Sequence, residues 1–355
     1  MIISLLQIYL RTGKCKSLDS PVRTTLAYDK NQPCAFSTTP VFSLHDRLGF
    51  SRSHRRRPAH HQVRYRDRQT GDIVAERVPG ESLLRWLYGT TFGSLFFRAA
   101  LNHPLCSRLC GWWQQNSWTR HQIRPFAERY RINLEELERP LDEYTSFNDF
   151  FIRRLKPNTR PCDPEPERLL SPADGKVLVY PQLGPGTILP VKSCTLTADA
   201  LLAGAIDPIP YRNGAALVVR LAPYDYHRFH FPADGQAGKT RMIEGDFHSV
   251  NPLALARKPN LFCYNRRSVC ELQTPTFGKI AYIEVGALNV ASIVQTSAPG
   301  PCERGGEKGF FQFGGSTIVL LFEPGAITFD DDLVSDSATG LEVHVHTASG
   351  LGRRA

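Results

Sequence analysis

The second half of the chain is divided into short β-rich segments, and this pattern constrains the fold more than any other feature. After about Leu169, apolar and β-branched runs alternate with Gly, Pro, Asp or Asn. The runs are 176–180, 215–221, 279–286, 291–295, 317–322 and 341–346. No helix-length periodic segments alternate with them, so the pattern favours a sandwich or barrel over alternating βα units.

The part of the chain before these runs has helical spacing instead. Apolar side chains recur at Leu84, Leu87, Tyr88, Thr91, Leu95 and Phe96, and a second apolar segment continues to Trp113. Arginines interrupt both segments, which disfavours a bilayer span. We predict amphipathic helices that pack on the domain, lie in a membrane interface, or do both. Further helices are predicted at 123–130 and after Ser146, a typical N-cap residue.

The first 60 residues differ from the rest and carry much positive charge. They are poor in acidic residues and include a basic run, Arg52, Arg55, Arg56 and Arg57. We predict a disordered extension, with a transit peptide or a membrane tether as alternatives. The whole chain has a net charge of +9, which attracts nucleic acid or anionic lipid. Because no zinc-finger spacing, RNA-binding signature or P-loop is present, we predict no nucleic-acid partner.

Three segments of the β-rich part concentrate reactive side chains. They are 171–176, with Asp174; 221–232, with His227 and His230; and 313–317, with Ser316. Together they supply a carboxylate, an imidazole and a hydroxyl, the groups that nucleophile activation requires. Each segment also has a simpler interpretation, as a turn or as hydrogen-bonded histidines. Further ligands at zinc-site spacing are missing, so we predict no metal.

Ser316 follows two glycines and precedes an apolar run that predicts a buried strand. Gly314 and Gly315 allow backbone conformations closed to other residues. A serine in this position can present its hydroxyl to the carbonyl carbon of Gly315, a geometry that suits attack by the chain on its own backbone. The alternative is a turn or bulge that contains Gly-Gly-Ser.

These stretches resemble the phosphatidylserine decarboxylase proenzyme family, whose members carry a Gly-Ser-Thr cleavage motif. The resemblance extends from about residue 65 to about residue 345, and the Gly-Gly-Ser-Thr form is similar to the branch that includes the eukaryotic-like enzymes. It also includes residues 144–156 (YTSFNDFFIRRLK), Arg160-Pro161, Asn251-Pro252, 259–262 (PNLF) and 322–325 (FEPG). The implied fold is α+β, with N-terminal membrane-facing helices followed by a β-rich, sandwich-like or barrel-like catalytic core.

The resemblance implies a self-processing decarboxylase that converts phosphatidylserine to phosphatidylethanolamine and CO2. Ser316 would attack the carbonyl of Gly315 and form an ester. Elimination would then leave a dehydroalanine, which hydrolyses to a pyruvoyl group with loss of ammonia. The pyruvoyl group would serve as the covalent cofactor, because its carbonyl supplies the electron sink that decarboxylation needs.

The family pattern also implies roles for individual residues. His230 would be the base for Ser316, and Asp174 would orient it, with Asp225 as a plausible further carboxylate. His227 would donate the proton after decarboxylation. The alternative for His227 is a purely structural partnership with Asp225.

The same resemblance implies partners, a location and a division of the chain. Arg257 and Lys258 could contact the lipid phosphate. We expect phosphatidylserine in an anionic membrane surface, the chain's own cleaved α and β chains as a heterodimer, and a possible homo-oligomer. The expected location is peripheral, on the cytoplasmic face of a bacterial cell membrane, with the mitochondrial inner membrane as the alternative. The predicted parts are a basic extension (1–60), a helical membrane-associating region (61–165) and a catalytic core (166–355) that is cut between 315 and 316.

Three rival functions stay open at this point. The chain could be a relative that decarboxylates another amino acid or serine-linked lipid. It could also be a non-catalytic basic membrane-binding protein with a vestigial triad. A conventional serine hydrolase is disfavoured because the Gly-x-Ser-x-Gly elbow is missing.

Overall fold

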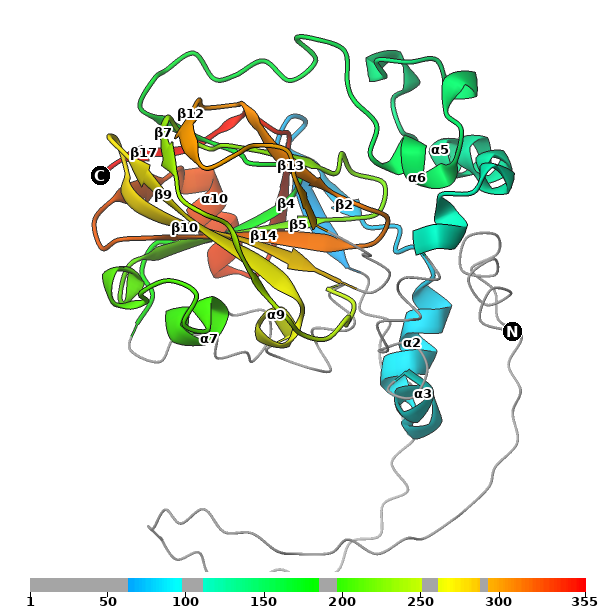
Figure 1. Cartoon of the computed structure of the whole chain (residues 1–355), viewed down its shortest axis with the longest axis horizontal. Helices are drawn as coiled ribbons and strands as arrows, with labels where there is room; N and C mark the ends of the chain where they lie inside the picture. Colours follow the sequence, from blue (N-terminus) through cyan, green and yellow to red (C-terminus); the bar gives the residue numbers. More distant parts are fainter. Residues whose placement is uncertain (1–62, 98–110, 185–196, 251–260, 288–292) are drawn as a thin grey trace, which may run out of the picture. The chain divides into compact units, whose positions relative to one another are not determined.

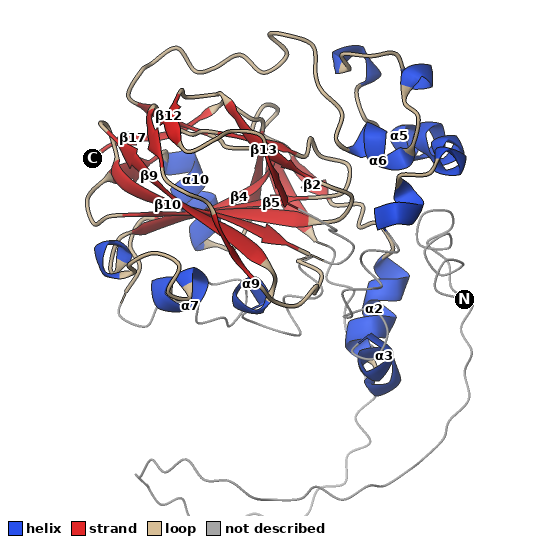
Figure 2. Ribbon diagram, in the orientation of Figure 1, coloured by secondary structure: helices blue, strands red, loops and turns tan. Residues whose placement is uncertain are grey.

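The protein is described by a computed structural model that covers residues 63–97, 111–184, 197–250, 261–287 and 293–355. All of these residues belong to one compact unit. Strands dominate the part after residue 168 and helices the part between 81 and 151, as Figure 2 shows. The predicted α+β class is therefore confirmed, whereas the sequence division at 60 and 165 stays a prediction.

A large sheet of 11 strands holds most of the core. In spatial order its strands are β12 (Gly300–Cys302), β7 (Gly235–Ala237), β9 (Arg267–Thr274), β10 (Gly278–Gly286), β14 (Ser316–Phe322), β5 (Ala215–Leu221), β4 (Gly175–Tyr180), β16 (Glu342–Val345), β1 (Arg64–Asp67) and β2 (Ile73–Ala75), and β8 (Arg241–Ile243) pairs with β9. The central strands pair antiparallel, and β14, β5 and β4 are buried along their whole length, which explains their continuous apolar runs.

Two sheets of three strands each complete the β structure. One, which we call the β6 sheet, contains β11 (Ile293–Gln295), β13 (Glu307–Phe311) and β6 (Arg228–His230). The other contains β15 (Ile327–Phe329), β17 (Gly350–Arg354) and β3 (Arg168–Leu170). The strands predicted from the sequence are confirmed within one or two residues at each end, apart from residues 291 and 292, which lie outside the described part.

Short helices cover parts of the large sheet (Figure 1). They are α7 (Ala198–Leu202), α9 (Leu261–Tyr264) and α10 (Asp331–Ala338), with a 3₁₀ turn at Ile209–Tyr211. Helix α10 packs against β4 and β16, and its Ser337 hydroxyl accepts a hydrogen bond from the backbone N–H of Val179 at 2.9 Å. The buried side chain of Leu333 anchors the same helix to the core.

The helical part of the chain is more broken than the sequence suggested. It contains α2 (Glu81–Gly89), α3 (Thr91–Phe96), α5 (Ile123–Tyr130) and α6 (Phe147–Phe151), with 3₁₀ turns at Ser117–Gln122, Leu134–Glu136 and Leu141–Glu143. The chain leaves helical geometry at Thr90, whose side chain caps α3 by accepting the N–H of Gly93. The predicted N-cap Ser146 is confirmed, since it accepts the N–H of Asp149. None of the helices in the described part is long and apolar enough to cross a bilayer.

Helix α6 holds the segment that precedes Ser316. Phe313 packs edge-on against Phe147 and Phe151, with ring centroids 5.3 and 5.2 Å away. The Oδ1 atom of Asn148 accepts the backbone N–H of Phe313 at 3.1 Å. The helical region therefore fixes the position of the Gly-Gly-Ser-Thr stretch from one side.

Candidate active site

Ser316 begins the central strand β14 and is fully buried. It pairs with Gly286 of β10 on one side and with Leu221 of β5 on the other. Its hydroxyl has no hydrogen-bond partner among the described residues. A buried hydroxyl without a partner costs about 1–3 kcal/mol, so such a group calls for a functional explanation.

The strand register shows which way Ser316 faces. Residues paired across an antiparallel sheet share a face, as do residues two apart in one strand. Tyr282 and Glu284 therefore lie on the same face as Ser316, through its pairing with Gly286. Tyr282 donates a hydrogen bond to the carbonyl of His230, and Glu284 forms an ion pair with Lys308 of β13. The Ser316 side chain thus faces the β6 sheet. His230 is part of strand β6 in that sheet, and His227 directly precedes the strand.

His227 lies directly before β6 and is fully buried. Its Nδ1 atom is 2.9 Å from the backbone oxygen of Asp225. Because a carbonyl oxygen only accepts hydrogen bonds, Nδ1 carries the proton in the neutral ring, and Nε2 keeps a lone pair. The ring packs on Phe151 at a centroid distance of 3.9 Å.

The surroundings of His227 keep its ring neutral. Burial and the positive charge of Arg153 lower the pKa of His227 to about 3, while the carbonyls of Asp225 and Gly314 act in the opposite direction. The influence of Gly314 places this histidine beside the proposed cleavage segment. At neutral pH the buried imidazole is therefore uncharged, and its Nε2 atom has no hydrogen-bond partner in the described structure.

His230 is the last residue of β6, and its Nδ1 atom has no hydrogen-bond partner among the described residues. Burial lowers the pKa of His230, and the negative charges of Glu307 and Asp174 oppose this shift. Its ring stacks on Tyr226 at 5.9 Å. It is therefore a second neutral imidazole with a free nitrogen near the face that Ser316 occupies.

Asp174 is held by Arg160. The Arg160 guanidinium donates from Nη2 to Oδ2 at 2.8 Å and from Nε to Oδ1 at 3.1 Å, and the Thr347 N–H donates to Oδ1 at 2.7 Å. Burial raises the pKa of Asp174, but its bonds to Arg160 outweigh that effect and hold the pKa well below its usual range. Asp174 forms no hydrogen bond with His230 in the described structure, so its influence on the pKa of that histidine is purely electrostatic.

The basic segment 153–160 lies partly inside the protein. Arg153 is buried, and Arg160 forms ion pairs with Asp174 and with Glu136. Arg154 and Lys156, by contrast, are exposed. Two of the four basic side chains therefore belong to the interior of the site, because the chain turns inward after α6.

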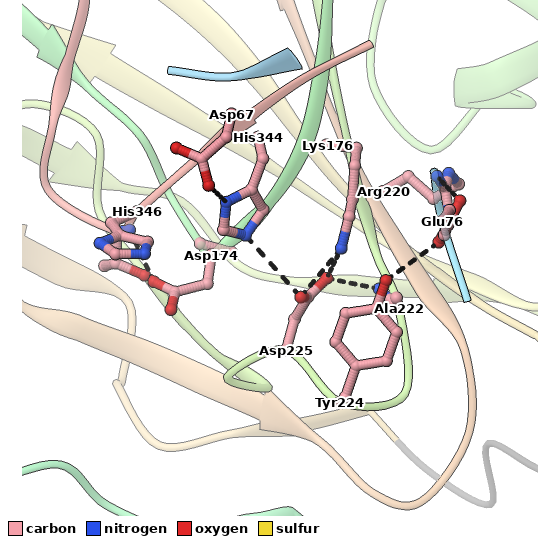
Figure 3. A network of polar contacts seen from close by, with 12 residues as sticks. Asp67, Glu76, Asp174, Lys176, Arg220, Ala222, Tyr224, Asp225, His344 and His346 are labelled. Carbon is pink, nitrogen blue, oxygen red and sulfur yellow. Dashed lines mark hydrogen bonds and ion pairs between the residues drawn. The ribbon is translucent and has the colours of Figure 1, made fainter. Parts of the chain in front are cut away.

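Asp225 joins a buried polar network on the other side of the site (Figure 3). Its carboxylate accepts hydrogen bonds from Lys176 Nζ at 2.9 and 3.0 Å and from the Ala222 N–H at 2.7 Å. His344 Nε2 lies 3.9 Å from the same carboxylate. The Asp225 carboxylate is thus engaged by Lys176, and His227 contacts only its backbone oxygen.

Several residues of the site were missed by sequence reasoning. Buried side-chain atoms without a hydrogen-bond partner in the described structure include Tyr144 Oη and Arg153 Nε and Nη1, besides those of His227, His230 and Ser316. The pair Glu284–Lys308 lies on the Ser316 face of the sheet. A charged residue inside the apolar run 279–286 was a visible signal for Glu284, whereas the proximity of Arg153 depends on tertiary structure.

Some of the predicted residues fall outside the part of the chain that the structure describes. Arg257 and Lys258 lie within 251–260, and the basic extension lies within 1–62. Their assignments stay predictions. The catalytic residues named from the sequence, Asp174, His227, His230 and Ser316, all lie in the described part. The influence of Gly314 puts His227 beside the segment before β14, whereas the Ser316 hydroxyl has no hydrogen bond to Asp174 or His230 among the described residues. Their catalytic roles stay predictions.

The fold and site define an α+β protein with a buried serine at the start of a central strand, whose hydroxyl has no partner in the described part and faces the sheet that carries His230. Residues 147–351 match the family model described as phosphatidylserine decarboxylase. The chain belongs to this family.

Curated relatives match over most of their length. A protein of Chlamydia pneumoniae is 46% identical over 290 residues, which cover 81% of this chain and 96% of the relative. A protein of Chlamydia muridarum is 45% identical over 291 residues, covering 82% and 97%. A third, of Chlamydia caviae, is 44% identical over 293 residues, covering 82% and 98%. Each is named phosphatidylserine decarboxylase proenzyme.

Proposed function

We propose that this chain is a self-processing phosphatidylserine decarboxylase that forms phosphatidylethanolamine and CO2. The observation that carries the proposal is the buried hydroxyl of Ser316, unpartnered in the described structure, which faces the sheet that holds His230. The family and the proenzyme names of its relatives support the same reaction. In this proposal the Gly315–Ser316 bond is the one that the chain cuts.

In the cleavage step, Ser316 is the nucleophile and His230 takes its proton. The neutral state of His230 suits this role, because only an unprotonated ring nitrogen can accept a proton. Asp174 contributes its negative charge, which stabilises the imidazolium that forms. Gly314 has φ of 146°, a backbone conformation that favours glycine, so the segment before the bond requires this residue.

The residues around Ser316 fit the pyruvoyl group that cleavage would create there. The group would supply the electron sink for decarboxylation. His227 would hold the proton that the product requires. Since this ring is neutral in the uncleaved chain, it must first take up a proton, and the negative charges of a bound phospholipid favour that uptake.

After cleavage the two chains would stay together as a heterodimer. The short chain, 316–355, begins with β14, which pairs along its length with β10 and β5 of the long chain. It also contributes α10 and β16, which pack on or pair with β4. Strand pairing and burial on this scale support a complex that survives the loss of one peptide bond.

Intact-mass analysis of purified wild-type protein tests the proposal. We expect two chains, one ending at Gly315 and one of 40 residues (355 − 315) whose amino end is blocked to Edman degradation. Decarboxylation of phosphatidylserine by protein that remains a single 39.8 kDa chain would contradict it. An uncut and inactive chain would instead favour the non-catalytic membrane-binding alternative.

We also propose that the helical region faces the lipid surface. Phe92 and Leu95 of α3 are 70% and 65% exposed, and Trp112 and Trp118 are each 59% exposed. Exposed aromatic and apolar side chains of this kind insert into the headgroup region of a bilayer. The location would be peripheral, on the cytoplasmic face of a bacterial membrane, with the mitochondrial inner membrane as the alternative.

Vesicle sedimentation tests this surface. We expect Phe92→Ser/Leu95→Ser protein to bind phosphatidylserine-containing vesicles at least about tenfold more weakly. Each apolar side chain that becomes buried in the lipid contributes about 1.5–3 kcal/mol to the binding free energy. Met242→Ser, at an exposed apolar position on β8, is the matched control and should bind as wild type does. Equal binding by all three proteins would show that α3 does not contact the lipid.

A further inference from the structure

Arg153 is a buried guanidinium with no carboxylate partner in the described structure. It is 4% exposed and follows directly on helix α6 and its cap. Its Nη2 atom donates to the backbone oxygens of Tyr224 at 2.9 Å and of Asp225 at 3.0 Å. The guanidinium lies over the ring of Phe150 at 5.0 Å, while its Nε and Nη1 atoms find no acceptor in the described part of the chain. Burying a charge in this way is expensive, so the position calls for a compensating role.

The backbone oxygen of Asp225 joins Arg153 to His227. This oxygen accepts from Arg153 Nη2 at 3.0 Å and lies 2.9 Å from His227 Nδ1. A carbonyl oxygen accepts in both contacts, so Arg153 Nη2 and His227 Nδ1 are the donors, and the His227 proton resides on Nδ1. Arg153 also fixes the turn at Tyr224 and Asp225, and that turn sets the direction of the His227 ring.

We propose that Arg153 is a positioning residue for His227, which it holds as the neutral Nδ1–H tautomer with Nε2 turned toward the Gly314 segment. The catalytic meaning of this arrangement rests on the proposed function. The arrangement itself concerns only the uncleaved chain and can be measured without any decarboxylase activity.

The charges around His227 show why Arg153 matters more than its neighbours. Arg153 and Lys176 are the cations that disfavour the imidazolium, whereas the carbonyls of Asp225 and Gly314 favour it. The Lys176 charge is compensated by the Asp225 carboxylate at 2.9 Å. Phe151 supplies an apolar surface on the ring and no charge. The Arg153 charge has no carboxylate in direct contact in the described structure, and Asp174 and Asp225 act on it only from a distance, so its field on His227 is less compensated than that of Lys176.

Removing this charge should therefore raise the pKa of His227. The sign follows from repulsion, since a nearby cation disfavours protonation and its loss restores it. For a charge within the site, we expect a rise of about one to two pKa units. If the role of Arg153 were purely structural, every folded variant at this position would have the same His227 pKa as the parent.

The test uses ¹⁵N-histidine NMR on full-length protein carrying Ser316→Ala, which keeps the chain uncut. A companion His227→Gln sample identifies the His227 signals among the 11 histidines. In the parent, the ¹⁵N shifts should show a neutral Nδ1–H tautomer throughout pH 5–8, and the titration is followed below pH 5 because the pKa of His227 is about 3. Arg153→Met should raise the His227 pKa by about one to two units, whereas Arg153→Lys should keep it within about half a unit of the parent. Arg154→Gln, a change at the exposed neighbour, should leave it unchanged.

Each outcome decides the matter. An Nε2–H tautomer in the parent overturns the proposal, as does an equal His227 pKa in the parent and in Arg153→Met. If Arg153→Met fails to fold, the tautomer in the parent and the His227 pKa in Arg153→Lys still decide. Arg153→Lys keeps the positive charge, so a rise of about one to two units in the His227 pKa of that variant would contradict an electrostatic role. Failure of wild-type protein to cleave itself would count against the proposed function and not against this arrangement.

Discussion

Ser316→Ala protein is expected to remain a single chain and to lose all decarboxylase activity. Without the hydroxyl there is no nucleophile at Gly315, and without cleavage there is no pyruvoyl group. Because enzymes accelerate such reactions by about 10⁶-fold or more, activity should fall to background. Intact mass and release of ¹⁴CO2 from carboxyl-labelled phosphatidylserine measure the two losses separately.

Thr317→Val is the matched control for this change. Thr317 is the next residue of β14, is equally buried, and also has a hydroxyl without a partner in the described structure. It pairs with Arg220 and points to the opposite face of the sheet. We expect Thr317→Val protein to cleave itself. Cleavage of Ser316→Ala at the normal position would show that Ser316 is not the nucleophile.

The rate of self-cleavage also tests the roles proposed for His230 and Asp174. His230→Ala should cleave about 10²–10⁴-fold more slowly, the usual loss when a general base is removed. Asp174→Asn should also be slow, and it should weaken the ion pair with Arg160 at 2.8 Å. Maturation of His230→Ala at the wild-type rate would contradict the role assigned to His230.

The second large effect is expected on stability. Lys308 and Glu284 form an ion pair that is almost completely shielded from water, with side-chain exposures of 1% and 0%. Lys308→Met would leave the Glu284 carboxylate buried, with hydrogen bonds from Ser268 and Gln295 alone among the described residues. Breaking a buried pair by removing one partner typically costs about 3–5 kcal/mol. Urea unfolding of the uncleavable Ser316→Ala protein should show this loss in the free energy of unfolding.

Two further variants show whether the loss comes from the unpaired charge. The double change Lys308→Met/Glu284→Leu removes both charges and should recover at least about half of the lost free energy. Arg85→Met breaks an exposed pair with Glu81 and should cost less than about 0.5 kcal/mol. A double variant that is less stable than Lys308→Met would contradict this account, because it would make the polar network itself stabilising.

Local patterns in the chain were enough to predict its strands and several helix boundaries. The run 317–322 is apolar and β-branched because β14 is buried on both faces between β10 and β5. Ser146 caps α6 as its side chain and position predicted. Asp174, His227, His230 and Ser316 could also be named as candidates, because their segments resemble the motifs of a known family, and their catalytic roles stay predictions. Strands and helix caps depend mainly on residues that are close in the sequence, so they can be predicted from the sequence alone.

The contacts of the site depend on segments that are far apart in the chain. Three contacts follow from the packing of α6, β4 and β6 around β14. Asp174 forms an ion pair with Arg160, and the Asp225 carboxylate forms one with Lys176. Arg153 and His227 both contact the backbone oxygen of Asp225. The sequence shows which groups can be charged or donate protons. Only the tertiary structure decides which of them meet and which are kept from water, because burial and distance set both pairing and pKa.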